Sequence, residues 1–157
     1  TLDEAANEML IHADAEDELE AKFSVEFCLA AVLREGRAGV GEFTDEYVQA
    51  EATREAMALV ERDFEADLFG DEFAGYGARV VVETADGERR ETAVRHAPGS
   101  PNNPVGEDRL VAKFEEAAGA VLAGEAVDEL RAAVESLGSE PGSLDRLLAA
   151  TSPPLVG

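Results

Sequence analysis

Apolar residues first gather into a helical pattern near the end of the first two dozen positions. The segment KFSVEFCLAAVLREG, residues 22–36, carries so few polar side chains that we predict a helix buried on most of its sides. Gly36 follows the last periodic position, where a C-cap glycine belongs. The preceding residues 12–21 are rich in Asp and Glu and predict a solvated loop or a short helix.

A second helical segment follows, with its start marked by capping chemistry. Thr44 stands at an N-cap position, with Phe43 and Val48 at the two positions of a hydrophobic staple. We therefore expect a helix of one or two segments over residues 45–60.

The middle of the chain shows the alternation that is typical of strands. The dipeptide Asp86-Gly87 predicts a type I′ hairpin turn between an apolar-rich strand and a second strand. Residues 1–11 are a further candidate strand, although Asp, Glu, Asn and Ala are poor strand formers. We expect a sheet of three to four antiparallel strands, with three of them near residues 59–68, 76–84 and 88–96.

The last third of the chain is predicted to be helical. Ser143 is a suitable N-cap for the final helix, and residues 151–157 should form a loose tail. Strands in the middle with helices before and after predict an α+β fold, an antiparallel sheet covered by helices in a single domain over residues 1–157. The expected helices cover residues 107–122, 125–137 and 143–150.

The charge of the chain then changes the picture of its surface. The sequence holds 35 Asp and Glu against 13 Lys and Arg, a formal net charge of −22, and 45% of its residues are hydrophobic. That hydrophobic content indicates a globular chain rather than a disordered one. Our preferred interpretation is adaptation to high salt, where carboxylate repulsion is screened. An acidic protein of ordinary surroundings, or one that faces a basic partner, is the alternative.

Several classes of function are excluded by composition. The net negative charge argues against nucleic-acid and anionic-membrane partners, and no apolar run approaches the length of a membrane span. Cys28 is the only cysteine, and His12 and His96 lie far apart in sequence, so we expect no disulfide, no metal site and no cofactor. No segment reads as a signal peptide, and we expect a cytoplasmic location.

Few residues suggest a catalytic or ligand-binding role. Lys22 and Ser24 open the buried helix, where backbone amides and a cation suit a carboxylate ligand; an ordinary cap beside a solvated lysine is the alternative. Arg95 and His96 precede the glycine-proline loop GSPNNP, and such loops line clefts or simply make tight connections. For Lys113 we expect a stem packed on the core with its charge in solvent.

The order of four motifs resembles the C-terminal domain of the MmgE/PrpD family from about Glu20 to the end of the chain. That family includes 2-methylcitrate dehydratase, cis-aconitate decarboxylase and iminodisuccinate epimerase. Each motif is weak alone, and their order and spacing make the resemblance specific. The motifs are Ala21 to Ser24, Gly36 to Thr44, Gly99 to Val105, and Lys113-Phe114.

This resemblance implies an α+β lid that closes over a larger, helical N-terminal domain. The implied chemistry is proton removal with loss of water or carbon dioxide from a small di- or tricarboxylate, without metal or cofactor. The main catalytic residues would belong to the helical domain, so the chain is expected to be a fragment without turnover. The expected partners are that helical domain, the polycarboxylate substrate and a second copy in a homodimer.

The resemblance also assigns roles to individual residues. Lys22 would bind a substrate carboxylate, and Ser24 would hydrogen-bond it or cap the helix. Phe27, where family members often carry Tyr, would shape the apolar wall, with Arg95 and His96 near the cleft rim. Two alternatives stay open: an epimerase of the same family, and a non-catalytic acidic interaction module.

Overall fold

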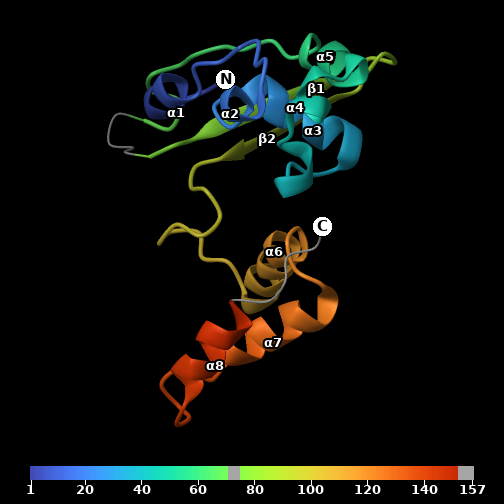
Figure 1. Cartoon of the computed structure of the whole chain (residues 1–157). Coiled ribbons are helices and arrows are strands. Elements are labelled where there is room, and N and C mark those ends of the chain that lie inside the picture. Colours follow the sequence, from blue (N-terminus) through green and yellow to red (C-terminus); the bar gives the residue numbers. More distant parts are fainter. Residues whose placement is uncertain (71–74, 152–157) are drawn as a thin grey trace. The chain divides into compact units, whose positions relative to one another are not determined.

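The computed structural model describes residues 1–70 and 75–151 (Figure 1). The chain forms two compact units, Thr1–Val105 and Gly106–Gly157. Helices and a small antiparallel sheet occur together, which confirms the predicted α+β class.

The first unit contains six helical segments and one hairpin among its described residues. The predicted helix over residues 22–36 is confirmed, and the one predicted over residues 45–60 is divided at Ala50, whose ψ of 134° is not helical. The elements are α1 (Glu4–Met9), α2 (Glu18–Ala21), α3 (Val25–Glu35), the 3-10 turn η1 (Val40–Glu42), α4 (Asp45–Gln49), α5 (Glu51–Met57), β1 (Ala78–Glu83) and β2 (Arg89–Val94).

The core of this unit lies where α3 packs against α5. Phe27, Ala30 and Ala31 are completely buried, because their spacing of three and four residues places them on one helix face. The expectation that α3 is buried on most sides is wrong: Val32 is 46% exposed and Leu33 56%. These two residues lie on the part of α3 that the other described elements leave uncovered.

The number of strands is lower than predicted, since the described residues form one two-stranded sheet. The expected strand over residues 59–68 is reduced to a single bridge at Phe64, which pairs with Leu2. Leu2 also forms a bridge to Ala78 at the edge of β1. Half of residues 59–68 are charged, and Phe64 is itself 48% exposed. The segment therefore has no continuous apolar face that would hold it against the sheet.

The candidate strand at residues 1–11 is mostly helix. The Asp3 side chain accepts a hydrogen bond from the Ala6 amide at 2.8 Å and so caps α1. The same buried carboxylate also accepts from the Gly77 amide, which ties the start of α1 to the residue before β1. A side-chain cap thus outweighed the extended preference that we had assigned to this segment.

The hairpin turn also differs from the prediction. Gly87 has a φ of +86°, whereas Asp86 has a negative φ, so the turn is not type I′. The Gly87 amide donates to the Thr84 carbonyl at 2.9 Å, and the Thr84 amide donates to the Glu88 carbonyl at 2.9 Å. This is a three-residue loop in which a turn is followed by a left-handed glycine, as in a G1 bulge.

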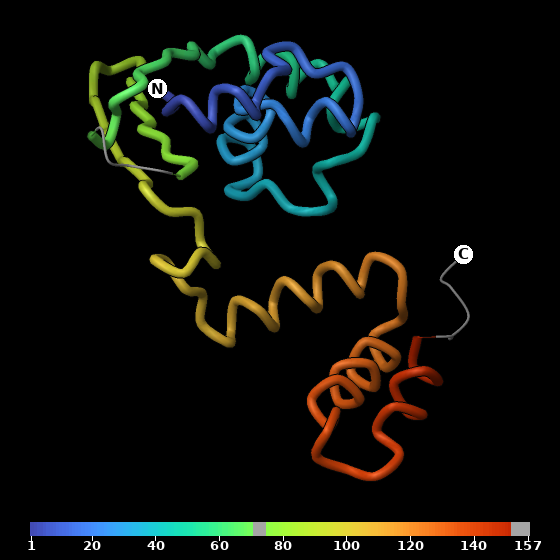
Figure 2. The backbone as a smooth tube through the Cα atoms, turned by 90° about the vertical axis from the view of Figure 1, so that its left-hand side faces the viewer, coloured from blue at the N-terminus to red at the C-terminus, as the bar shows by residue number. Residues whose placement is uncertain are grey.

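As far as it is described, through Thr151, the second unit contains three successive helices (Figure 2), which confirms the predicted helical end of the chain. Gly142 rather than Ser143 is the N-cap of the last helix, and Ser143 is its first residue. The prediction of a loose tail concerns residues 151–157, of which 152–157 lie outside the described residues. The three helices are α6 (Glu107–Gly119), α7 (Gly124–Glu135) and α8 (Ser143–Ala150).

Candidate functional site

The junction between α2 and α3 carries two of the predicted site residues. Lys22 ends α2 and exposes 49% of its side chain, with Nζ 3.7 Å from Oε1 of Glu18. Ser24 is completely buried, and its Oγ accepts a hydrogen bond from the Phe27 amide at 3.1 Å. Of the two roles predicted for Ser24, the structure therefore confirms the helix cap.

Beneath this junction lies a buried ion pair that the sequence analysis did not identify. Arg62 donates from Nε to Glu26 Oε1 at 2.9 Å and from Nη2 to Glu26 Oε2 at 2.6 Å. The side chain of Glu26 is 7% exposed and that of Arg62 is 20% exposed. Ser24 Oγ donates to the same carboxylate at 3.4 Å, so the cap and the ion pair form one network.

His12 lies against the same junction. Its backbone amide donates to the Phe23 carbonyl at 3.1 Å, and its Nδ1 is 3.6 Å from Oε1 of Glu20. Arg62 reaches this neighbouring segment as well, since its Nη1 donates to the Leu10 carbonyl. The segment that contains His12 therefore runs beside residues 22–24.

Phe27 is located in the core rather than on the surface. Its ring is completely buried, 5.1 Å from the ring of Phe43 and 6.1 Å from that of Tyr47, which it meets edge-on. Within the described residues Phe27 presents no surface to a ligand, so any influence on a binding site would pass through its packing. Burial, and then the charge of Glu26, raise the pKa of the neighbouring Cys28 thiol.

Arg95 and His96 belong to a different segment, directly after β2. The Arg95 guanidinium lies over the Phe69 ring at 5.5 Å and donates to the Phe69 carbonyl at 3.2 Å. The His96 carbonyl accepts a hydrogen bond from Nδ2 of Asn103 at 2.8 Å. The GSPNNP loop is thereby bonded back onto the end of the hairpin.

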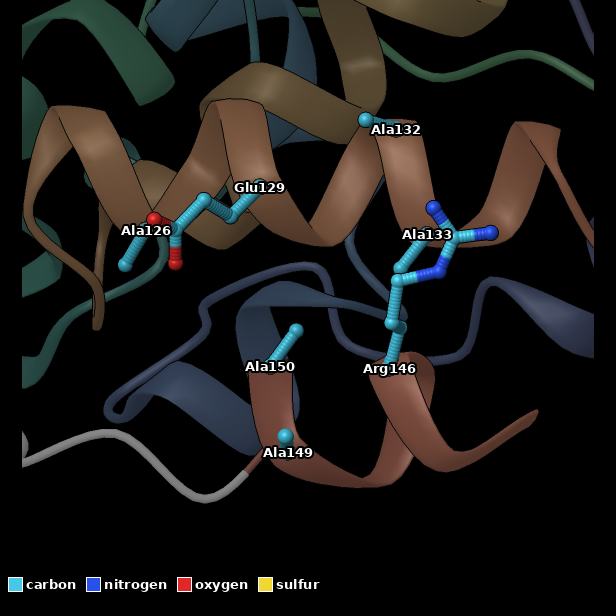
Figure 3. A pocket seen from close by; sticks show the side chains of 7 residues that line it. All are labelled: Ala126, Glu129, Ala132, Ala133, Arg146, Ala149 and Ala150. Carbon is cyan, nitrogen blue, oxygen red and sulfur yellow. The ribbon is translucent and has the colours of Figure 1, made fainter. Parts of the chain in front are cut away.

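A pocket in the second unit lies between α7 and α8 (Figure 3). Its two charged residues are Glu129 and Arg146, and the Arg146 guanidinium pairs with Glu140. None of the predicted site residues lines it, and its walls are mostly methyl groups, so it offers no chemistry. The lining residues are Ala126, Glu129, Ala132, Ala133, Arg146, Ala149 and Ala150.

Neither a metal cluster nor a membrane-spanning helix is found in the described parts of the chain. Across residues 1–70 and 75–151, no group of three or more His, Cys, Asp or Glu side chains is arranged to hold a metal ion. In the same part of the chain, no helix combines the length and apolar character that crossing a membrane requires.

One feature of the sequence indicates the pair of Glu26 and Arg62. Glu26 interrupts the apolar run SVEFCLAAV, and a carboxylate inside such a run needs a partner when it is buried. That signal indicates a cation somewhere, but it does not say which of the eleven arginines supplies it.

The groups at the α2–α3 junction are suited to binding a ligand rather than to breaking a bond. The junction presents one exposed ammonium group, that of Lys22. The backbone at this point is hydrogen-bonded to α2, because the backbone amide of Ser24 donates to the Ala21 carbonyl at 3.2 Å. A lysine ammonium of this kind acts as a point charge toward carboxylates.

Comparison with known proteins agrees with the motif pattern. The MmgE/PrpD C-terminal domain matches residues 1–139, which covers the junction, the hairpin, the GSPNNP loop and Lys113-Phe114. Comparison with curated protein sequences gives no match. The chain belongs to the MmgE/PrpD enzyme family, as a C-terminal domain of it.

Proposed function

We propose that this chain is the lid of an MmgE/PrpD-type lyase that removes water or carbon dioxide from a small di- or tricarboxylate without a metal ion. The family match supports the enzyme context. The helical N-terminal domain that accompanies this domain in the family would supply the main catalytic residues. Homodimer formation is part of the same proposal.

The observation that carries the proposal is the placement of Lys22. Its ammonium is exposed on a hydrogen-bonded backbone, and its contact with Glu18 is a surface ion pair of small stability. A substrate carboxylate can replace such a partner at little cost. The chain has only two lysines and a net charge of −22, so an exposed lysine is rare on this acidic surface, and its position beside the α2–α3 junction favours a role in binding an anion.

The other predicted residues receive roles that fit their surroundings. Arg95 and His96 would lie at the cleft rim, where Arg95 is exposed and stacked on Phe69. Ser24 would act through its cap, and Phe27 would support the wall through its packing against Phe43.

The central test replaces each lysine by alanine in the polypeptide that joins this domain to the family's N-terminal domain. We expect Lys22→Ala to raise KM for the polycarboxylate by about tenfold or more, since a hydrogen bond to a charged group is worth about 1.5–3 kcal/mol. Lys113→Ala is the matched control and should leave KM unchanged, because no contact with the substrate is proposed for this exposed lysine of α6. An unchanged KM for Lys22→Ala would refute the assigned role.

Two further measurements address the reaction itself. Product analysis separates loss of water from loss of carbon dioxide, and inversion without elimination would instead identify an epimerase. The 157-residue chain alone should fold without turnover. Turnover by the chain alone would contradict the lid assignment.

A further inference from the structure

The Glu26–Arg62 pair has the geometry of a positioning device. Two hydrogen bonds, at 2.9 Å and 2.6 Å, join two nitrogens of the guanidinium to the two carboxylate oxygens. Such bidentate pairs fix orientation as well as distance. The two residues are 36 positions apart, so the pair locks the chain that follows α5 onto the first turn of α3.

Stability is a weak explanation for this pair. Removing two charges from water costs several kcal/mol per ion, and apolar side chains of similar volume often serve a fold equally well. Both side chains are largely buried here, at 7% and 20% exposure. The pair is better explained by what it holds in place.

What the pair holds is the backbone that directly follows Lys22. Glu26 accepts a hydrogen bond from Ser24, which caps α3 two residues after Lys22. Arg62 also binds the Leu10 carbonyl, and two residues further along that segment the His12 amide binds the carbonyl of Phe23, the residue after Lys22. A single arginine therefore connects the two structures that hold Phe23 and Ser24 in place.

We infer that Arg62 is a positioning residue for Lys22: it orients the carboxylate-binding ammonium through Glu26 and the Leu10 segment without contacting the substrate. This inference rests on the proposed function, in which Lys22 binds a substrate carboxylate. It predicts that Arg62 and Lys22 act as one unit in substrate binding.

The test is a double-mutant cycle in the two-domain enzyme. Arg62→Met should raise KM for the polycarboxylate by about tenfold with a smaller change in kcat, because it weakens binding through Lys22. Adding Arg62→Met to Lys22→Ala should raise KM no further, since residues that act as one unit are not additive. Arg62→Lys keeps the charge but loses the fork, so it should restore KM only in part.

Arg54 provides the matched control. It also links a backbone carbonyl and a carboxylate, because its guanidinium donates to Ala15 O at 2.6 Å and to Asp14. Arg54→Met should lower the melting temperature and leave KM unchanged. Should Arg62→Met fail to fold, Glu26→Gln retains the side-chain volume and is expected to raise KM in the same non-additive way with Lys22→Ala.

The possible outcomes separate the two proposals. If Lys22→Ala raises KM while Arg62→Met behaves like Arg54→Met, the positioning inference is overturned and the proposed function stands. Additive effects in the double variant would overturn it as well. If Lys22→Ala leaves KM unchanged, the proposed function fails and the inference fails with it.

Discussion

At the scale of single residues, two consecutive side chains near the start of α3 differ in how deeply they are buried. Phe27 points into an aromatic cluster with Phe43 and Tyr47 and is completely buried. Cys28, one position later, is only partly buried at the edge of the same core. The helix period alone explains this difference, because consecutive residues lie about 100° apart around the helix axis.

The Cys28 thiol should react slowly while the protein is folded. Its pKa is raised by burial and by the charge of Glu26, so less of the nucleophilic thiolate forms at a given pH. At pH 8 we expect alkylation by iodoacetamide to be about tenfold slower or more in the native protein than in urea. Mass spectrometry of samples taken over time measures both rates.

The same shift has a consequence for stability against pH. A folded pKa above the unfolded one means that the contribution of Cys28 is complete below the unfolded value, near 8.5, and decreases as pH rises above it. Cys28→Ala should therefore lose less stability between pH 8 and pH 10 than the parent chain. Equal alkylation rates in native buffer and in urea would contradict this account of the thiol.

At the scale of elements, the β1–β2 hairpin depends on its loop. The Thr84 hydroxyl and then the backbone amides of Glu88 and Asp86 donate to the Asp86 carboxylate and lower its pKa. Because the pKa of Asp86 is lowered in the folded state, its contribution to stability is present above the unfolded pKa and is lost as pH falls through the folded pKa.

The register of the two strands continues from this loop, with Glu83 opposite Arg89 and Ala78 opposite Val94.

Gly87 should be required for its backbone conformation alone. A Cβ at this position would meet no atom within 4 Å, yet its φ of +86° is one that alanine adopts at a cost of about 1–2 kcal/mol. We expect Gly87→Ala to lower the free energy of unfolding by about 1 kcal/mol, measured by urea denaturation. Gly87→Asn is the control and should cost less, because asparagine tolerates the left-handed region. Equal losses for the two variants would show that backbone strain is not the cause.

At the scale of the whole molecule, charge is the dominant property. Thirteen basic side chains cannot neutralise 35 acidic ones, even though many arginines pair with carboxylates on their own unit. Examples are Arg79 with Glu65 at 2.9 Å and Arg131 with Glu135 at 2.8 Å. The remaining carboxylates repel one another, and this repulsion opposes the compact state in dilute buffer.

The melting temperature should rise with salt. Between 0.1 M and 1 M KCl the Debye length falls from about 10 Å to about 3 Å, which screens most surface repulsion. We expect an increase of about 5 °C or more, the shift that roughly 1–2 kcal/mol produces in a chain of this size. A variant with the exposed residues Glu46, Glu55 and Glu61 changed to Gln should respond less steeply. A melting temperature that does not rise with KCl would refute the interpretation of adaptation to high salt.

The amino-acid sequence by itself determined the features that depend on a few neighbouring residues. The Ser24 and Thr44 caps and the left-handed Gly36 are found where they were predicted, because each is formed by hydrogen bonds within one turn of helix. The MmgE/PrpD resemblance, carried by short motifs in order, is likewise confirmed.

Only the tertiary structure decided what depends on distant segments. The pairing of Glu26 with Arg62 needs two segments to meet, and neither residue type nor local spacing selects the partner. Whether residues 59–68 join the sheet also depends on a distant segment, and in the described structure Phe64 makes only a bridge to Leu2. The burial of Phe27 is likewise decided by the residues that α4 and α5 bring to α3, since burial is a property of the packed core and not of the side chain alone.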